Sequence, residues 1–106
     1  MAERVDAAAF DAAVLGAETP VLVDFYQDSC VPCKRLTPQL AKLEEAHRGE
    51  LSVVKVNANF DPELASRLSV MATPTLVLFK DGEEVARSTG FLRLSELEDL
   101  VAPALG

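Results

Sequence analysis

The chain has 106 residues, a formal net charge of −7, 49% hydrophobic residues and 25% charged residues. This length and composition predict a single domain, residues 1–106, with an ordinary apolar core. The acidic charge disfavours nucleic acids and anionic membranes as partners, because phosphate-rich surfaces attract basic faces. The N-terminus lacks the basic and apolar regions of a secretory signal, and no apolar run approaches the roughly 18 residues of a membrane span. We therefore expect a cytoplasmic protein and, at this size, a monomer.

Four extended segments, rich in β-branched and aromatic residues, predict strands at residues 21–26, 51–56, 75–79 and 84–88. The first two are apolar enough to be buried in the interior. The pair Asp81 and Gly82, between the last two segments, is typical of a tight hairpin. These last two strands should therefore be antiparallel neighbours at one edge of a sheet.

Helical patterns with one apolar face alternate with these strands. Asp6 can cap the first helix, and Asp61 followed by Pro62 is typical of the start of a short third helix. Ser95 and Glu98 have the spacing of a capping box at the start of the C-terminal helix. This alternation predicts an α/β fold in which four helices flank a central, mainly parallel sheet of four to five strands, mixed because of the hairpin.

The two cysteines, Cys30 and Cys33, lie between a predicted strand and a predicted helix that runs to about Gly49. Unpaired N–H groups and the dipole at a helix N-terminus stabilise a thiolate, the attacking form of cysteine, so we expect Cys30 to be the nucleophile. Cys33, one turn further and more buried, is then the resolving thiol. Pro32 is tolerated because the first helical turn does not use its missing N–H, whereas Pro38 predicts a kink. The motif predicts dithiol–disulfide exchange that needs no cofactor.

A structural disulfide and half of a zinc site are the alternative interpretations of this motif. A disulfide across so short a loop would contribute only roughly 2 kcal/mol to stability. A closed zinc site wants four ligands, and His47, the one further candidate of the Cys or His type, lies far along the helix, where we expect a solvated side chain. Both alternatives are therefore disfavoured, and we predict no metal site.

The residues around the cysteines resemble the thioredoxin family, and the resemblance covers most of the chain, from about Phe10 to Leu100. It rests on the strand 21–25, the sequence Cys30-x-Pro32-Cys33-Lys34, Pro38, the strand 52–57, Thr73-Pro74-Thr75, the hairpin 79–83 and Gly90. The resemblance implies the thioredoxin fold and the reduction of protein disulfides. It also implies two partners, namely disulfide-containing protein substrates and a thioredoxin reductase or other dithiol donor that restores the dithiol.

The resemblance further implies roles for residues outside the motif. Asp24 would be a buried carboxylate beneath the cysteines, and Lys55 its neighbour on the adjacent strand. A buried carboxylate titrates abnormally or finds a partner, which suits a proton relay to Cys33, although a purely structural polar residue is the alternative. The bond between Thr73 and Pro74 would be cis, and the Thr73 backbone would pair with a bound substrate strand. The implied substrate-binding residues are Ser29, Val31, Pro32, Thr73, Pro74 and Gly90.

Several positions depart from the family pattern. Ser29 stands where the family usually has tryptophan, Val31 where it has glycine, Tyr26 in place of another tryptophan and Asn59 in place of an aspartate. The first strand, confined to residues 2–5, should be about two residues short. The Ser29 hydroxyl can hydrogen-bond a thiolate, and Val31 adds a stiff apolar side chain. We therefore hypothesise that substrate range and redox potential differ from those of a typical thioredoxin.

Three alternative functions stay open at this point. An oxidant or isomerase would share the fold but have a more stable reduced form. A glutathione-coupled redoxin would need basic residues near Thr73 and Pro74, and the sequence shows none there. A redox-independent peptide-binding or co-chaperone module would use the groove around Pro32 and would not need the cysteines. Replacing both cysteines by serine would separate this last function from that of a reductase.

Overall fold

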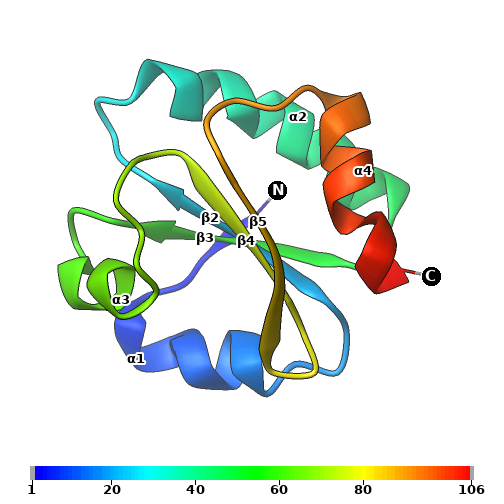
Figure 1. Cartoon of the computed structure of the whole chain (residues 1–106), viewed down its shortest axis with the longest axis horizontal. Helices are drawn as coiled ribbons and strands as arrows, with labels where there is room; N and C mark the ends of the chain where they lie inside the picture. The colour runs from blue at the N-terminus through cyan, green and yellow to red at the C-terminus, as the bar shows by residue number, and fades with distance from the viewer. Residues whose placement is uncertain (1, 106) are drawn as a thin grey trace.

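A mixed five-stranded sheet forms the centre of the protein, with helices on both of its faces (Figure 1). The computed structural model describes residues 2–105. In chain order, the strands are β1 Glu3–Arg4, β2 Val21–Tyr26, β3 Ser52–Asn57, β4 Thr75–Lys80 and β5 Glu83–Thr89. Their order in the sheet is β1-β3-β2-β4-β5. The four strands predicted from hydrophobic patterning are all present, and the α/β fold with a mixed sheet is confirmed.

The direction of β4 differs from the prediction. β1, β3 and β2 are parallel, but β4 runs antiparallel to β2, as β5 does to β4. A helix between two strands makes them parallel only when it runs back along the sheet, and the short α3, Pro62–Arg67, does not. The chain therefore enters β4 at the end of the sheet at which β3 ends.

The remaining helices pack in pairs on the two faces of the sheet. α1, Ala7–Phe10, continues into a π-helical segment, Asp11–Leu15, and lies with α3 on one face, while α2, Val31–Ala46, and α4, Leu94–Leu105, cover the other (Figure 1). α2 ends at Ala46 rather than at the predicted Gly49, which lies in the following turn with a φ of +84°. α2 continues through Pro38, and the kink stays a prediction.

Alternation along β2 divides the core between the two faces. Val21, Val23 and Phe25 face α1 and α3 in one apolar cluster, and Leu22 faces α2 and α4 in the other. Successive side chains of a strand point to opposite sides, so Asp24 points to the α2 side, where only 4% of its surface is exposed. The core that stabilises the sheet thus carries a carboxylate under α2.

The short first strand is present and pairs with β3. Glu3 and Arg4 lie opposite Val54 and Lys55, and the Val5 N–H donates to the Lys55 carbonyl at 2.8 Å, which extends the pairing by one hydrogen bond. This confirms the expected position of the strand within residues 2–5. Lys55 is therefore held on a strand that is paired on both sides.

The N-terminus of α1 is capped by two carboxylates. Asp6 accepts a hydrogen bond from the Ala9 N–H at 2.9 Å, as predicted. Asp61 is the N-cap residue of α3 and Pro62 starts the helix, as predicted, but the Asp61 side chain makes no capping hydrogen bond to α3. Its Oδ1 instead accepts from the Ala7 N–H at 3.1 Å, so the acidic residue that precedes α3 satisfies an unpaired donor of α1.

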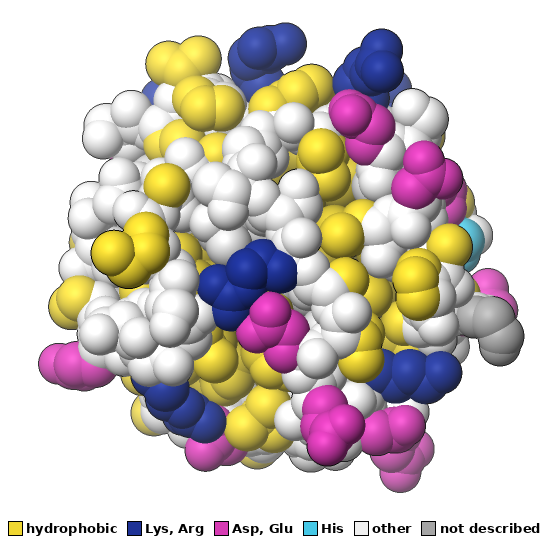
Figure 2. Space-filling model, in the orientation of Figure 1, with side chains coloured by type: hydrophobic (Ala, Val, Ile, Leu, Met, Phe, Trp, Pro, Cys, Tyr) yellow, Lys and Arg dark blue, Asp and Glu magenta, His cyan; other side chains and the backbone are white. Residues whose placement is uncertain are grey.

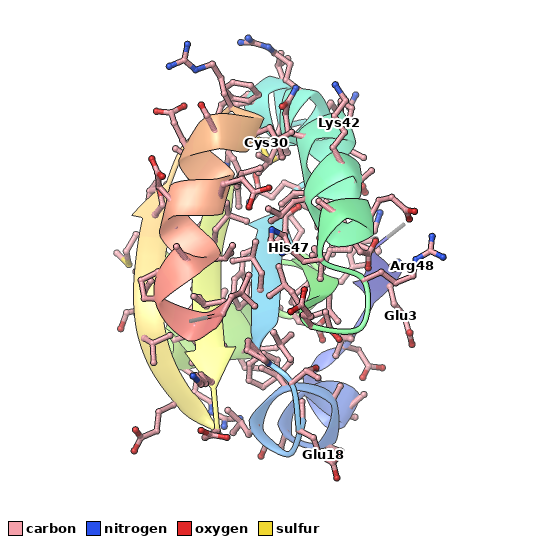
Figure 3. The ribbon with its side chains drawn as sticks, turned by 90° about the vertical axis from the view of Figure 1, so that its right-hand side faces the viewer. Glu3, Glu18, Cys30, Lys42, His47 and Arg48 are labelled. Atoms are coloured by element: carbon pink, nitrogen blue, oxygen red, sulfur yellow. A yellow bond between two sulfur atoms is a disulfide. The ribbon has the colours of Figure 1, made fainter. Side chains whose placement is uncertain are left out.

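The start of α4 also differs from the sequence-based prediction. The helix begins at Leu94, and Glu96 rather than Glu98 reaches back, accepting from the Arg93 N–H at 3.0 Å. The Leu94 N–H donates to Gln39 Oε1 of α2 at 3.0 Å. Glu98 instead meets His47 Nε2 at 2.6 Å, and His47 lies between α2 and α4 (Figure 3). His47 is therefore a half-buried link between two helices and not the solvated residue that was expected.

Replacement of Asp61 by alanine should lower the free energy of unfolding by about 1 kcal/mol, because it removes a capping acceptor from α1. Urea denaturation followed by circular dichroism measures this change. Asp99→Ala, an exposed substitution on α4, should change the free energy by less than about 0.5 kcal/mol. Equal effects of the two substitutions would show that the Asp61 cap does not contribute.

Candidate active site

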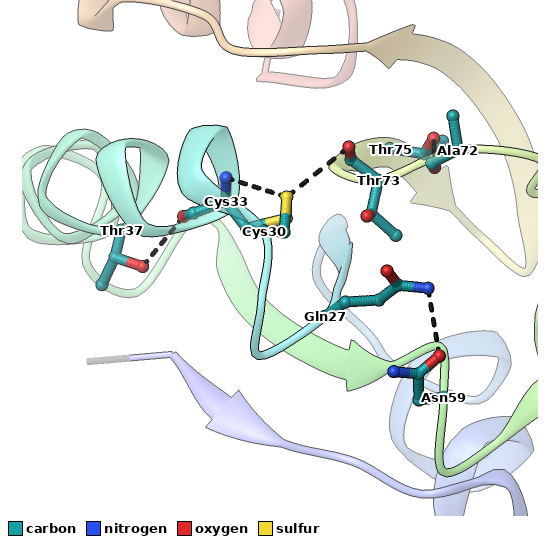
Figure 4. The surroundings of a disulfide bond; sticks show 8 residues. All are labelled: Gln27, Cys30, Cys33, Thr37, Asn59, Ala72, Thr73 and Thr75. Atoms are coloured by element: carbon teal, nitrogen blue, oxygen red, sulfur yellow. Dashed lines mark hydrogen bonds between the residues drawn. A yellow bond between two sulfur atoms is a disulfide. The ribbon is translucent and has the colours of Figure 1, made fainter.

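The two cysteines lie where the chain leaves β2 and enters α2. Cys30 is the N-cap of α2, and its Sγ accepts a hydrogen bond from the Cys33 N–H at 3.2 Å (Figure 4). The two residues form a disulfide with their Cα atoms 5.2 Å apart. Cys33 is 4% exposed, whereas Cys30 is half-buried. An N–H directed at Sγ stabilises negative charge on that sulfur once the disulfide is reduced.

The loop before β4 lies directly against Cys30. The peptide bond between Thr73 and Pro74 is cis, and the Thr73 carbonyl oxygen lies 3.6 Å from Cys30 Sγ (Figure 4). Gly90, at the end of β5, donates its N–H to the Pro74 carbonyl at 2.8 Å. Its φ of +98° lies in the region that favours glycine. The structure thus places the Thr73–Pro74 loop against Cys30, and Gly90, 16 residues after Pro74 in the sequence, is hydrogen-bonded to that loop.

The other predicted substrate-binding residues surround the disulfide on the solvent side. Ser29 precedes Cys30 and is exposed, and Pro32 is exposed in the first turn of α2. Val31 is 67% exposed, a large value for an apolar side chain. These three residues are therefore exposed next to Cys30 along the chain.

Asp24 lies under this surface, beside Cys33. Its Oδ1 is buried and has no hydrogen-bond partner among residues 2–105. It borders a cavity of about 140 Å³ that is lined by Asp24, Tyr26, Gln27, Asp28, Cys33, Lys34, Thr37 and Lys55. Burial raises the pKa of the Asp24 carboxyl from its usual value of 3.8 to about 7, and the positive charge of Lys55 lowers it by a smaller amount. The carboxyl therefore gains or loses a proton near neutral pH.

Lys55 is the partner of Asp24 across the pair of strands β2 and β3. Its Nζ lies 5.2 Å from the centre of the Tyr26 ring, close enough for a cation–π interaction. Lys55 thus has a second contact at the mouth of the cavity besides its electrostatic effect on Asp24. Tyr26, the residue that replaces a family tryptophan, supplies this contact.

The structure adds contacts that sequence reasoning missed. Gln27 Nε2 donates to Asn59 Oδ1 at 3.1 Å, which joins the turn before Cys30 to the segment after β3 (Figure 4). Thr37, one turn beyond Cys33, donates its hydroxyl to the Cys33 carbonyl at 3.3 Å and lines the cavity at Asp24. Gln27 and Asn59 follow β2 and β3, which are parallel neighbours. Parallel strands end at the same end of a sheet, so their order in the sequence could have suggested the contact between Gln27 and Asn59.

Within residues 2–105, no group of three or more His, Cys, Asp or Glu side chains could hold a metal ion. The same residues include no helix that is long and apolar enough to cross a membrane.

Comparison with known proteins agrees with this geometry. The family model for thioredoxin matches residues 2–103. The chain belongs to the thioredoxin family. Thioredoxin C-2 of Corynebacterium nephridii is 42% identical over 88 residues, which cover 83% of this chain and 82% of that protein. A thioredoxin of Alicyclobacillus acidocaldarius is 39% identical over 96 residues (91% and 90% covered), and one of Mycobacterium tuberculosis is 39% identical over 102 residues (92% and 88% covered).

This membership and the Cys30–Cys33 pair identify a thiol–disulfide oxidoreductase that reduces protein disulfides. The fold, the redox-active disulfide and the activity expected from the resemblance are therefore confirmed. Ser29 and Val31, two positions at which the sequence is expected to depart from the family pattern, are both exposed beside the disulfide.

The raised pKa of Asp24 predicts that stability falls as the pH rises from about 4 to about 7. In this window the folded state keeps a proton that the unfolded chain has lost, so deprotonation favours unfolding. Asp24→Asn should remove this pH dependence. The free energy of unfolding of the variant, minus that of wild type, should therefore increase by on the order of 1 kcal/mol per pH unit in this window. Urea denaturation at several pH values measures the difference.

Asp28→Asn is the matched control, because Asp28 is exposed in the turn that follows the same strand. Its difference from wild type should not vary with pH in this window. A pH-independent difference for Asp24→Asn would contradict the raised pKa.

Proposed function

We propose that Cys30 is the nucleophile of this thioredoxin and Cys33 its resolving thiol. The observation that carries the assignment is the contact between the Cys33 N–H and Cys30 Sγ at the start of α2. A thiolate at Cys30 is favoured by this donor and by the helix N-terminus. The half-buried Cys30 can meet a substrate sulfur, whereas the buried Cys33 can reach only a sulfur already bonded to Cys30.

The reaction then proceeds in two exchanges. The Cys30 thiolate attacks one sulfur of a substrate disulfide, so a Cys30–substrate bond forms, the substrate S–S bond breaks, and the first substrate thiolate leaves and takes up a proton. The Cys33 thiolate next attacks Cys30 Sγ, which forms the Cys30–Cys33 disulfide and releases the second substrate thiolate. Two electrons pass from the dithiol to the substrate, and a thioredoxin reductase or other dithiol donor returns them.

In this proposal Asp24 accepts the proton of Cys33. Asp24 and Cys33 line one cavity, which is large enough for a water molecule to connect them. A pKa of about 7 lets the carboxylate take a proton at neutral pH and release it again. Lys55, on the neighbouring strand, is a positioning residue that tunes the charge of Asp24.

Substrate docking is proposed for the surface around the disulfide. An extended substrate segment pairs with the backbone of Thr73, beside Pro74 and Gly90, in the manner of an added strand. The exposed side chains Ser29, Val31 and Pro32 contact the same segment. We propose that the protein acts as a single-domain monomer in the cytoplasm, with no metal or organic cofactor.

Cys33→Ser should accumulate a covalent complex between Cys30 and a disulfide substrate, because the resolving step is lost. Cys30→Ser should accumulate no such complex, because the buried Cys33 cannot reach the substrate. Non-reducing electrophoresis and mass spectrometry of mixtures with a disulfide-bonded protein measure the adduct. An adduct formed by Cys30→Ser and not by Cys33→Ser would reverse the two roles.

The reduction potential of the Cys30–Cys33 pair should lie below the cytosolic glutathione potential, as a reductant requires. Equilibration in dithiothreitol buffers, followed by alkylation of free thiols, measures it.

The double substitution Ser29→Trp with Val31→Gly should shift the reduction potential or the rates of reaction with partner proteins, since both residues border the disulfide. If the double substitution changes neither the potential nor the rates, Ser29 and Val31 have no effect on them. A clearly more oxidising potential of the wild-type protein would instead favour an oxidant or isomerase.

A further inference from the structure

Arg35 is an exposed arginine on α2 whose guanidinium makes no ion pair or hydrogen bond within residues 2–105. It lies instead over the ring of Phe91, with its Cζ atom 4.6 Å from the ring centre. Most other arginines of the chain form an ion pair with a carboxylate: Arg48 with Glu45, Arg67 with Asp11, Arg87 with Glu84 and Arg93 with Glu96. The positive charge of Arg35 is therefore available to an outside partner.

The contact with Phe91 holds the guanidinium in place. Phe91 is half-buried and packs against the apolar cluster under α2 and α4, so its ring is a fixed surface. A guanidinium over an aromatic face gains a cation–π interaction, and the N–H groups at its edge remain able to bind a carboxylate through two hydrogen bonds. Arg35 therefore loses less conformational entropy on binding than a freely moving arginine loses.

Arg35 lies on the side of α2 that leads to the disulfide. It follows Val31 by four residues and Pro32 by three, a spacing that makes residues neighbours on a helix surface. Side chains of a helix lean toward its N-terminus, and the N-cap of α2 is Cys30. The guanidinium therefore extends toward the proposed docking residues rather than toward the far end of α2.

Phe91 brings the same guanidinium to the loop after β5. Phe91 directly follows Gly90, whose N–H donates to the Pro74 carbonyl at 2.8 Å. Figure 3 shows Cys30 at the end of the molecule at which α4 begins, and the loop that carries Phe91 leads into α4. The charge of Arg35 thus lies between two segments that the proposed substrate contacts, namely the start of α2 and the loop bonded to the cis-proline.

The charges around Arg35 favour an acidic partner. Arg93, two residues beyond Phe91, is balanced by Glu96 at 3.5 Å, and Lys34 lines the cavity beneath the disulfide together with two aspartates. In Figure 2, the upper edge of the molecule, where Figure 1 places α2 and the loop before α4, shows basic side chains beside hydrophobic ones, and most acidic side chains lie to the right and below. Arg35 is thus an unbalanced positive charge next to the disulfide of a protein whose net charge is −7.

We propose that Arg35, held over Phe91, binds a carboxylate side chain of the protein substrate and thereby determines which disulfides the protein prefers, namely those flanked by aspartate or glutamate. The inference rests on the proposed dithiol exchange at Cys30. It goes beyond that exchange because it assigns a charge preference to a residue outside the cysteine pair and outside the predicted docking residues.

The interaction acts on the encounter and on the bound complex. Unlike charges raise the rate of encounter, and a carboxylate that accepts two hydrogen bonds from one guanidinium orients the bound segment. Arg35 stays exposed to solvent, so the effect is modest and is screened by salt. The preference should therefore be largest at low ionic strength.

The test uses disulfide-linked dimers of short peptides that differ only in the residues flanking the cysteine. The reference has glutamine on both sides, two peptides carry glutamate before or after the cysteine, and a fourth carries lysine. Second-order rates of reduction by the reduced protein are divided by the rates with dithiothreitol, which corrects for differences in intrinsic reactivity.

At low ionic strength we expect at least one glutamate peptide to react about threefold faster than the reference, the size of effect that an exposed charge pair supports. The lysine peptide should react more slowly than the reference. In about 1 M salt the glutamate preference should fall to about onefold, because the charges are screened.

Variants link the preference to the guanidinium. Arg35→Gln removes the charge and should reduce the glutamate preference to about onefold. Arg35→Lys keeps the charge without the planar guanidinium and should retain part of the preference. Phe91→Leu removes the ring beneath the guanidinium and should also lower the preference in part. Each preference is a ratio of two rates of the same protein, so a change in the reactivity of Cys30 cancels.

Arg48→Gln is the matched control. It changes the net charge by the same amount as Arg35→Gln, but Arg48 follows the C-terminal end of α2, away from Cys30 (Figure 3). This variant should keep the wild-type preference. Circular dichroism verifies that each variant is folded, and the two Arg35 variants decide the matter if Phe91→Leu does not fold.

The outcomes separate this inference from the proposed function. Equal normalised rates for the glutamate and glutamine peptides, or a preference that survives in Arg35→Gln, would overturn the role of Arg35 while leaving dithiol exchange intact. An equal loss of preference in Arg48→Gln would overturn it as well, because the net charge of the protein would then be the cause. Failure to reduce any peptide, including the glutamine reference, would overturn dithiol exchange at Cys30 and this inference with it.

Discussion

The central position of β2 is the constraint on which the site depends. β2 pairs in parallel with β3 and antiparallel with β4, so the end of β2 and the start of β4 lie at the same edge of the sheet. Phe25 lies opposite Thr75 in this register. The turn that carries Cys30 and the loop that carries Thr73 therefore emerge side by side, and the 3.6 Å contact between Cys30 Sγ and the Thr73 carbonyl follows from the pairing of the strands.

The same register determines the electrostatics beneath the disulfide. Alternation along β2 turns Asp24 toward α2, and the parallel pairing places Lys55 beside it. Burial disfavours the charge of Asp24, whereas the N-terminus of α2 favours a charge on Cys30. The protein thus places Cys30 Sγ at a helix N-terminus, close to a carboxylate that accepts protons near neutral pH. The two opposite effects stem from one strand–helix junction, and together they suit the proposed transfer of a proton from Cys33 to Asp24.

Features that depend on neighbouring residues were predictable from the sequence, whereas features that depend on tertiary packing were not. The strands, the helix start at the cysteines and the cap at Asp6 were predictable, because period-two patterning and capping involve neighbouring residues. The acidic residue before α3 was recognised as a cap, but packing of α1 against the segment after β3 directs Asp61 to the Ala7 N–H. Glu98 is similarly drawn to His47 because α4 packs on the end of α2. The direction of β4 depended on the end of the sheet at which the chain re-enters after α3, which helical periodicity does not reveal.

The sequence by itself determined the reactive pair, because two cysteines at the start of a helix have their chemistry set by local backbone groups. It also determined which residues could resemble a thioredoxin site, including Asp24, Thr73, Pro74 and Gly90. Only the tertiary structure decided that these residues meet, that Asp24 and Cys33 share a cavity, and that Arg35 lies over the ring of Phe91. The physical reason is that a cavity and a desolvated charge arise from side chains distant in sequence, and their packing exists only in the folded sheet.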